Sequence, residues 1–112
     1  MPMMFGFARQ RRQLLDAELQ RILAEVLPFG AQRMYVTGDL ARGRLTPASE
    51  LELVIVQETA ELFHRRPDFW VTHLRPRVGT RFVVYTPEEF EALAENDPVL
   101  VDAQRSGMVV IG

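Results

Sequence analysis

Apolar residues recur at spacings of three and four along residues 8–27, at Leu15, Leu19, Ile22, Leu23 and Val26. This spacing places them on one stripe of an α-helix, with charged residues around the rest of its surface. Pro28 and Gly30 follow directly and predict the end of the helix. Residues 1–7 lie outside the pattern, so we expect them either to be flexible or to pack against a partner.

Short apolar runs bounded by glycine, proline and polar residues predict four strands, over residues 32–37, 50–56, 80–85 and 108–111. The stretch 53–56 is continuously apolar, as in a central strand that is covered on both faces. Helical patterns separate the strands. We therefore predict one α/β (α+β) domain over residues 1–112, with a small mixed sheet of about four strands flanked by helices.

Local signals predict two helices in the last third of the chain. Thr86, Pro87 and Glu89 match an N-cap, a first helical position and the third position of a capping box. The helix that they begin is expected to run to about residue 95. Residues 98–105 predict a last short helix before the fourth strand.

Another helix is predicted from Pro67, between the second and third strands. Phe69 and Trp70 lie on its apolar face, and we expect both in the core rather than against a ligand. Arg65 and Arg66 precede it. They form either a solvated pair in a loop or a pair that contacts phosphate, and we favour the solvated pair.

Composition narrows the classes of function. Apolar residues are 47% of the 112 residues and charged residues are 25%, which is ordinary for a soluble globular protein. The net charge of −2 gives no support to general nucleic-acid binding. Without cysteine, the chain has no disulfide, thiolate or cysteine-zinc chemistry. His64 and His73 match no metal-ligand spacing.

The sequence also predicts a location. No apolar run approaches the ~18 residues that a membrane span needs. The first apolar residues come before the arginines of residues 9–12, which is the reverse of a secretory signal. We therefore expect a cytoplasmic protein that does not contact membranes.

Candidate chemistry concentrates in residues 36–57, which predict a strand, a glycine turn, a loop and a second strand. Glu50 and Glu52 are two residues apart, so they share one face of the second strand. Gly38 permits a positive φ and a close approach by a ligand. A short helix starting at Ala41 would direct N–H groups toward an anion. A plain strand-to-helix turn fits the same residues.

This stretch resembles the signature of the minimal nucleotidyltransferase family, in the DNA polymerase β superfamily. Six residues fall in register with it, namely Gly38, Ala41, Arg42, Gly43, Ser49 and Leu53. Asp39 stands where the family has serine, and Glu50 and Glu52 stand where it has aspartate. The resemblance, which covers roughly residues 12–112, implies a nucleotidyltransferase fold. It also implies nucleotide contacts from Gly38, Asp39, Arg42, Gly43 and Ser49.

The resemblance implies a reaction that uses ATP and Mg²⁺, with Glu50 and Glu52 as metal ligands. The family's third carboxylate lies five residues before Thr86, and that position is Arg81. Since neighbouring strands are about 4.8 Å apart, we expect Arg81 to form a charge-assisted, bidentate pair with Glu50 or Glu52. The Arg81 guanidinium would then repel the metal, and Asp39 would repel a triphosphate.

Three functions remain open on these grounds. One is an inactive or weakly active member that binds a partner, as an antitoxin binds a helical HEPN-type toxin. Another is an active Mg²⁺-dependent transferase that moves AMP from ATP to a protein. The last is a regulator that binds a nucleotide without chemistry. A homo-oligomer is compatible with each, and so is the case in which Glu50, Glu52 and Arg81 are unrelated surface residues.

Overall fold

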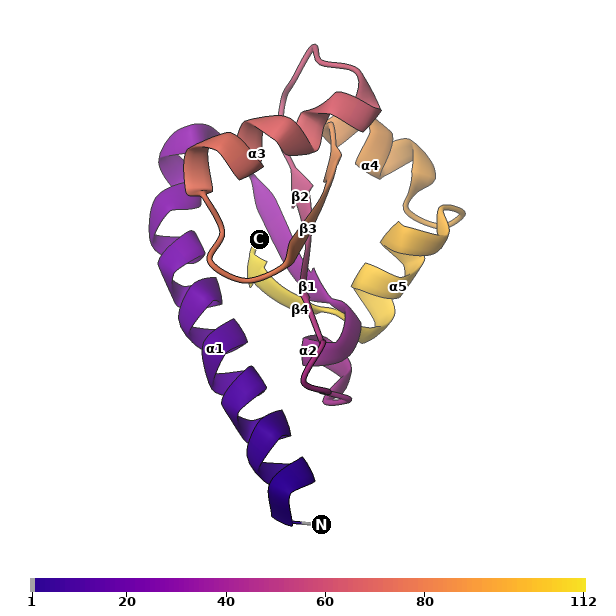
Figure 1. Cartoon of the computed structure of the whole chain (residues 1–112). Coiled ribbons are helices and arrows are strands. Elements are labelled where there is room, and N and C mark those ends of the chain that lie inside the picture. Colours follow the sequence, from indigo (N-terminus) through magenta and orange to yellow (C-terminus); the bar gives the residue numbers. More distant parts are fainter. Residues whose placement is uncertain (1) are drawn as a thin grey trace.

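A computed structural model describes the backbone of residues 2–112 and the side chains of residues 6–112. Its elements alternate between helices and strands along the chain (Figure 1). They are α1 (Pro2–Val26), η1 (Leu27–Phe29), β1 (Arg33–Thr37), α2 (Gly38–Arg42), β2 (Leu51–Val56), η2 (Phe63–Arg65), α3 (Arg66–Leu74), β3 (Thr80–Tyr85), α4 (Pro87–Leu93), α5 (Pro98–Ser106) and β4 (Met108–Ile111).

The four strands form one mixed sheet in the order β3-β2-β1-β4. β1 is antiparallel to both β2 and β4, whereas β2 and β3 are parallel. A parallel pair needs a crossover connection, and α3 lies within it. The predicted α/β fold with a four-stranded mixed sheet is therefore confirmed.

Helices cover both faces of the sheet, as Figure 1 shows, with α1 and α3 on one side and α4 and α5 on the other. Leu51, Leu53 and Ile55 of β2 pack with α1 and α3 in the larger core cluster. Val54, between them in sequence, packs with Leu100 of α5 in a second cluster. The continuous apolar run of β2 is thus explained by burial on both faces.

The start of α1 differs from the prediction. The helix begins at Pro2 rather than at residue 8. Its first turns extend beyond the rest of the molecule in Figure 1, so they have no sheet to face. The hydrogen bonds of a helix are local, so the helix continues there without it. The expected packing of residues 1–7 against a partner remains a prediction, and Met1 lies outside the described residues.

Two local predictions near the turns have opposite outcomes. The Thr86 hydroxyl accepts from the Glu89 N–H, and the Glu89 carboxylate accepts from the Thr86 N–H, so the capping box is confirmed. The predicted start at Ala41 is wrong, because α2 starts at Gly38 and ends at Arg42. Gly43 has φ 70°, and it serves as the C-cap of this five-residue helix.

Arg66 is not the solvated residue that was predicted, because it is only 8% exposed. It donates to the Val84 carbonyl at 3.0 Å, to the Glu61 carbonyl at 2.9 Å, and to both oxygens of Glu89 at 2.6 and 3.2 Å. These bonds tie the start of α3 to β3 and α4. Arg65 is exposed, as predicted.

The two aromatic residues of α3 differ in burial. Trp70 is fully buried in the core, as predicted. The core prediction for Phe69 is wrong, because its side chain is 38% exposed. Neighbouring residues on a helix point about 100° apart, so a narrow apolar face buries one ring and leaves the other at the rim.

The ionisation of Glu18 makes the free energy of unfolding depend on pH. Its side chain is 3% exposed, and it accepts hydrogen bonds from the Arg21 guanidinium and from the Arg77 N–H. The bond from Arg21 is the largest cause that holds the Glu18 pKa below its ordinary 4.5, and burial opposes it only in part. A lowered pKa in the folded state stabilises the fold above pH 4.5, and this stabilisation is lost as the pH falls through the folded pKa.

We expect the Glu18→Gln variant to lose less stability than the wild type between pH 5 and about pH 3, because it has no carboxylate to protonate there. Urea unfolding at several pH values measures this slope. Glu95→Gln, at an exposed site between α4 and α5, is the matched control and should keep the wild-type slope. Equal slopes in all three proteins would show that Glu18 does not set the acid limit.

Candidate functional site

Most of the predicted site residues meet at one edge of the sheet. The directions of the strands place the C-terminal end of β1 beside the N-terminal ends of β2 and β3. Thr37 is paired with Glu52, and Glu52 is paired with Arg81. Gly38 follows Thr37 directly, so residues far apart in the sequence lie side by side here.

Gly38 has φ 73°, the positive value that was predicted. A Cβ at this position would overlap the Glu52 carboxylate. The close approach that requires glycine is therefore made by the protein's own carboxylate, whereas the sequence predicted an approach by a ligand. Glycine is suited to both demands, since it tolerates the left-handed region and has no side chain.

The two glutamates share a face but lean toward different strands. Glu52 lies against Gly38 at the end of β1, whereas Glu50 lies against Gly79, just before β3. Leu51 between them is buried on the opposite face, as the strand period requires. Within residues 6–112, no three acidic or histidine side chains gather closely enough to hold a metal ion.

The bidentate pair predicted for Arg81 is not formed. Its Nη1 is 3.9 Å from Oε1 of Glu52, which is an ion contact but too long for a hydrogen bond. The Arg81 side chain is 68% exposed, so water competes for its donors. No ion pair between Arg81 and Glu50 is found among the side chains that the structure describes. Arg81 thus places positive charge beside one of the two carboxylates.

Asp39 and Ser49 bind each other. The Ser49 hydroxyl donates to Oδ2 of Asp39 at 2.8 Å, and it accepts from the Thr46 N–H at 2.8 Å. The Ser49 carbonyl accepts from Nε of Arg11 on α1 at 2.7 Å. Ser49 is 3% exposed, so this loop is fixed to α2 and to α1. Both side chains predicted to contact a nucleotide have a partner inside the protein.

Arg42, the third side chain predicted to contact a nucleotide, forms an ion pair with Asp102 of α5. Asp102 also lines a cavity of about 220 Å³ together with Glu52 and Arg81. Asp102 was not among the predicted site residues, because its partner lies 60 positions away in the chain. The helical pattern of residues 98–105 could have indicated that one polar residue of this helix faces the sheet.

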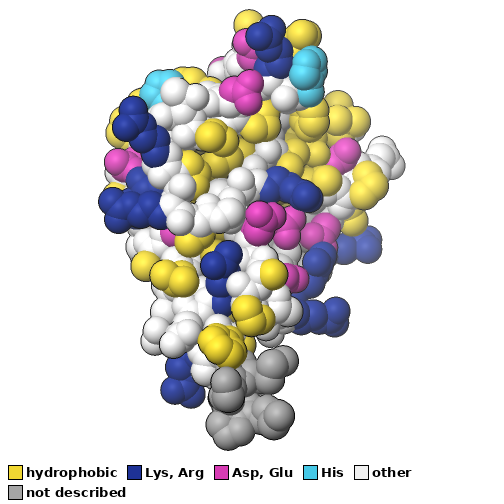
Figure 2. Space-filling model, viewed as in Figure 1, with side chains coloured by type: hydrophobic (Ala, Val, Ile, Leu, Met, Phe, Trp, Pro, Cys, Tyr) yellow, Lys and Arg dark blue, Asp and Glu magenta, His cyan; other side chains and the backbone are white. Residues whose placement is uncertain are grey.

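The charged residues that line this cavity are thus two acids and one arginine. On the face shown in Figure 2, acidic and basic side chains are likewise mixed rather than gathered into one basic surface. A polyanion binds best to a continuous positive surface, so this face gives no support to nucleic-acid binding.

No helix in residues 2–112 has the length and apolar character that crossing a membrane would require.

Comparisons with known proteins add one finding. No protein-family model matches the sequence, and no curated protein matches it significantly. The chain does resemble the crystal structure of a candidate nucleotidyltransferase from Sulfolobus solfataricus, with a TM-score of 0.53 and 15% sequence identity. The match covers 94% of this chain and 83% of that chain. The chain has a nucleotidyltransferase-like fold.

At this identity the likeness concerns the fold alone. Within this nucleotidyltransferase-like fold, the edge formed by β1, β2 and β3 carries Gly38, Glu50, Glu52 and Arg81 together. Arg65 and Arg66 lie at the other end of β3, where Arg66 contacts the Val84 carbonyl. Five residues of strand separate them from this edge by roughly 16 Å, so they belong to a different part of the molecule.

Proposed function

We propose that this nucleotidyltransferase-like protein is a binding module whose metal and nucleotide site is inactive or only weakly active. One observation carries the proposal: Arg81 is paired in register with Glu52, where a third carboxylate would stand in an active member. Mg²⁺ needs several oxygen ligands in near-octahedral geometry at about 2.0–2.1 Å. An arginine beside one of two diverging carboxylates supplies neither the oxygen nor the geometry.

The nucleotide contacts support the same proposal. Arg42 is neutralised by Asp102, and Asp39 presents a carboxylate at the turn where a triphosphate would lie. A triphosphate would have to displace the Arg42–Asp102 pair and approach Asp39 against like charge. We infer that ATP and Mg²⁺ bind weakly or not at all.

The partner that we propose is a helical protein of the HEPN type, with this chain in the role of an antitoxin. This part of the proposal rests on the resemblance to minimal nucleotidyltransferases. Such a protein would act in the cytoplasm. We expect this partner, or a second copy of the chain, to bind at the N-terminal end of α1, which extends past the rest of the molecule (Figure 1).

A second candidate is an active, Mg²⁺-dependent transferase of AMP to a protein. It is favoured by the cavity that Glu52 and Asp102 line together, since two carboxylates on one cavity could share a metal. A third is a regulator that binds a nucleotide without chemistry.

Calorimetric titration with MgATP, combined with a label-transfer assay, separates the three. We expect no heat of binding and no transfer from the wild-type protein. Binding with transfer of label from ATP to protein would contradict the proposal and support the transferase. Binding without transfer would support the regulator.

The variant with Arg81→Asp, Asp39→Ser, Glu50→Asp and Glu52→Asp tests the physical argument directly. It replaces all four departures from the family signature, so we expect Mg²⁺-dependent heat of ATP binding to appear. The matched control keeps Arg81 and carries the other three changes, and it should stay silent because the arginine still repels the metal. If both variants stay silent, the arginine is not what prevents metal binding.

A further inference from the structure

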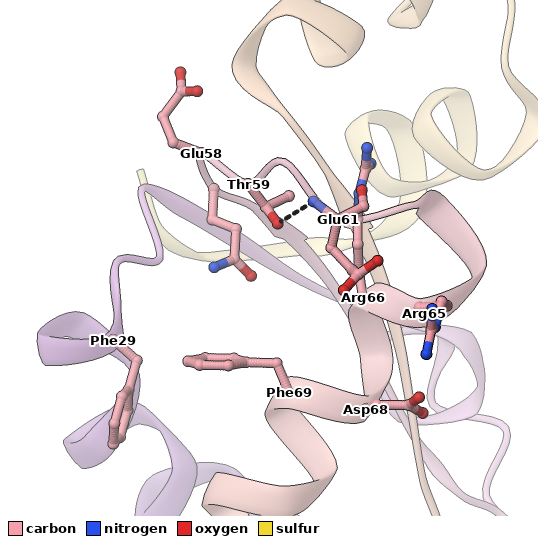
Figure 3. A pocket seen from close by; sticks show the side chains of 9 residues that line it. Phe29, Glu58, Thr59, Glu61, Arg65, Arg66, Asp68 and Phe69 are labelled. Carbon is pink, nitrogen blue, oxygen red and sulfur yellow. Dashed lines mark hydrogen bonds between the residues drawn. The ribbon is translucent and has the colours of Figure 1, made fainter.

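A second cavity lies at the opposite end of the sheet from the candidate site. It has a volume of about 540 Å³ and is bounded by η1, by the segment after β2 and by the first turns of α3 (Figure 3). A volume of this size falls within the range of small-molecule sites, about 300–1,000 Å³. Neither the sequence signature nor the proposed function uses it.

Gln57 at the end of β2 lines this cavity with a fixed amide. Its side chain is 9% exposed, and its Oε1 accepts from the indole N–H of Trp70. An indole N–H can only donate, so the amide oxygen must face Trp70 and the amide nitrogen must point away from it. Gln57 is therefore held in one orientation from within the core.

The amide nitrogen of Gln57 opens into the cavity. No side chain or carbonyl among the described residues accepts from it, yet no buried side-chain nitrogen or oxygen of these residues lacks a partner. The nitrogen is consequently accessible, and the cavity is the space that Gln57 lines. A pre-oriented, accessible N–H donor of this kind can bind an acceptor oxygen of a ligand.

Aromatic rings form the opposite wall. Phe29 and Phe69 are each 38% exposed, and their ring centroids are 6.0 Å apart at 79°. Figure 3 shows them on one side of the cavity, with Thr59 and Glu61 on the other. Half-exposed rings at such an angle gain by packing against a flat apolar ring.

The charges around the cavity select against an anion. Glu58, Glu61 and Asp68 line it, and the charge of Arg66 is already matched by Glu89. Arg65 is the other basic residue of the lining. A carboxylate or phosphate ligand would face like charge, whereas an uncharged carbonyl would not.

We propose that this cavity binds a planar, uncharged aromatic carboxamide or lactam. The ligand carbonyl accepts from the Gln57 amide nitrogen, and its N–H donates to the Thr59 hydroxyl or the Glu61 carboxylate. The ring of the ligand packs against Phe29 and Phe69. Each polar group of such a ligand then has a partner of the right kind in the cavity.

Three probes of nearly equal shape test the proposal: benzamide, benzamidine and benzoate. They are neutral, cationic and anionic, so size does not confound charge. The chain has one tryptophan, so a ¹⁵N-labelled sample gives a single indole signal, from Trp70. We expect benzamide to shift this signal and the Gln57 side-chain signals, with a Kd on the order of 1 mM. Benzamidine has no acceptor for the Gln57 N–H and benzoate meets like charge, so each should bind at least about tenfold more weakly.

Equal binding of benzamidine or benzoate would overturn the proposal, as would the absence of any shift with benzamide up to its solubility limit. Gln57→Glu replaces the donor with an acceptor of the same shape. It should reverse the preference, so that benzamidine binds more tightly than benzamide. An unchanged preference in a folded Gln57→Glu variant would also overturn the assignment.

Phe69→Leu tests the aromatic wall without touching the buried amide. It should weaken benzamide binding several-fold, because a stacking surface is lost. Phe7→Leu makes the same change at an exposed site on α1 and should bind like the wild type. If the Gln57 variant does not fold, the comparison of these two leucine variants decides. If benzamide binding is weakened equally in both leucine variants, or is weakened in neither, the proposed site is rejected.

Discussion

Replacing Arg66 with alanine should lower the free energy of unfolding by about 3 kcal/mol, near the lower end for a buried ion pair that loses one partner. The change removes the donors to Glu89, to the Val84 carbonyl and to the Glu61 carbonyl at once. The lower end applies because the Glu89 side chain is 35% exposed and recovers some hydration. Urea unfolding measures the loss, which corresponds to a fall in Tm of roughly 12 °C.

Arg65→Ala is the matched control, since it makes the same change one residue earlier at an exposed side chain. It should stay within about 0.5 kcal/mol of the wild type. Arg66→Lys should fall between the two, because an ammonium keeps the charge but cannot reach all four acceptors in one plane. Equal effects at residues 65 and 66 would mean that the buried pair does not hold α3 to α4.

Gly107→Ala should cost about 2–3 kcal/mol, the upper part of the range for an added methyl group in a packed site. An alanine Cβ there would lie 2.5 Å from the Ala103 carbonyl oxygen and 2.9 Å from the Val36 carbonyl oxygen. Both are backbone atoms, so α5 would have to move away from β1. The φ of −80° suits alanine, so the cost is steric alone.

Two other glycines provide matched controls for the same substitution. Gly6 lies in α1, and Gly43 ends α2 with φ 70°; a Cβ at either would meet nothing within 4 Å. Gly6→Ala should raise stability by about 0.5 kcal/mol through helix propensity. Gly43→Ala should cost about 1 kcal/mol through its backbone angle. A Gly107 variant no less stable than the Gly43 variant would show that the contact between α5 and β1 is loose.

The parts of the fold that were predicted correctly rest on local chemistry. The third and fourth strands have the predicted bounds, and the capping box of Thr86 and Glu89 is formed as expected. A cap is a set of hydrogen bonds within three residues, and a strand is an alternation within six. Both are therefore present in the sequence itself.

The parts that failed depend on partners that are far away in the chain. Arg66 looked solvated because Glu89, 23 positions later, is not visible as its partner in a local pattern. Asp102 was missed for the same reason. The packing of α5 against the sheet decides which of its polar residues meets Arg42, and spacing alone does not determine that packing.

The candidate site has features that follow from the local sequence and features that depend on distant partners. The shared face of Glu50 and Glu52 followed from the strand period. Their divergence did not, because it depends on Gly38 and Gly79 in two neighbouring strand ends. The resemblance placed Arg81 beside Glu50 or Glu52, and the strand register pairs it with Glu52, at a distance that the sequence could not give.

The bond from Arg11 to the Ser49 carbonyl joins α1 to the loop before β2. The Ser49 hydroxyl in turn donates to Asp39, next to the turn at Gly38. Two hydrogen bonds through Ser49 therefore connect the surface of α1 to the acidic end of the sheet, while Leu15, Leu19 and Ile22 hold the helix itself in the core.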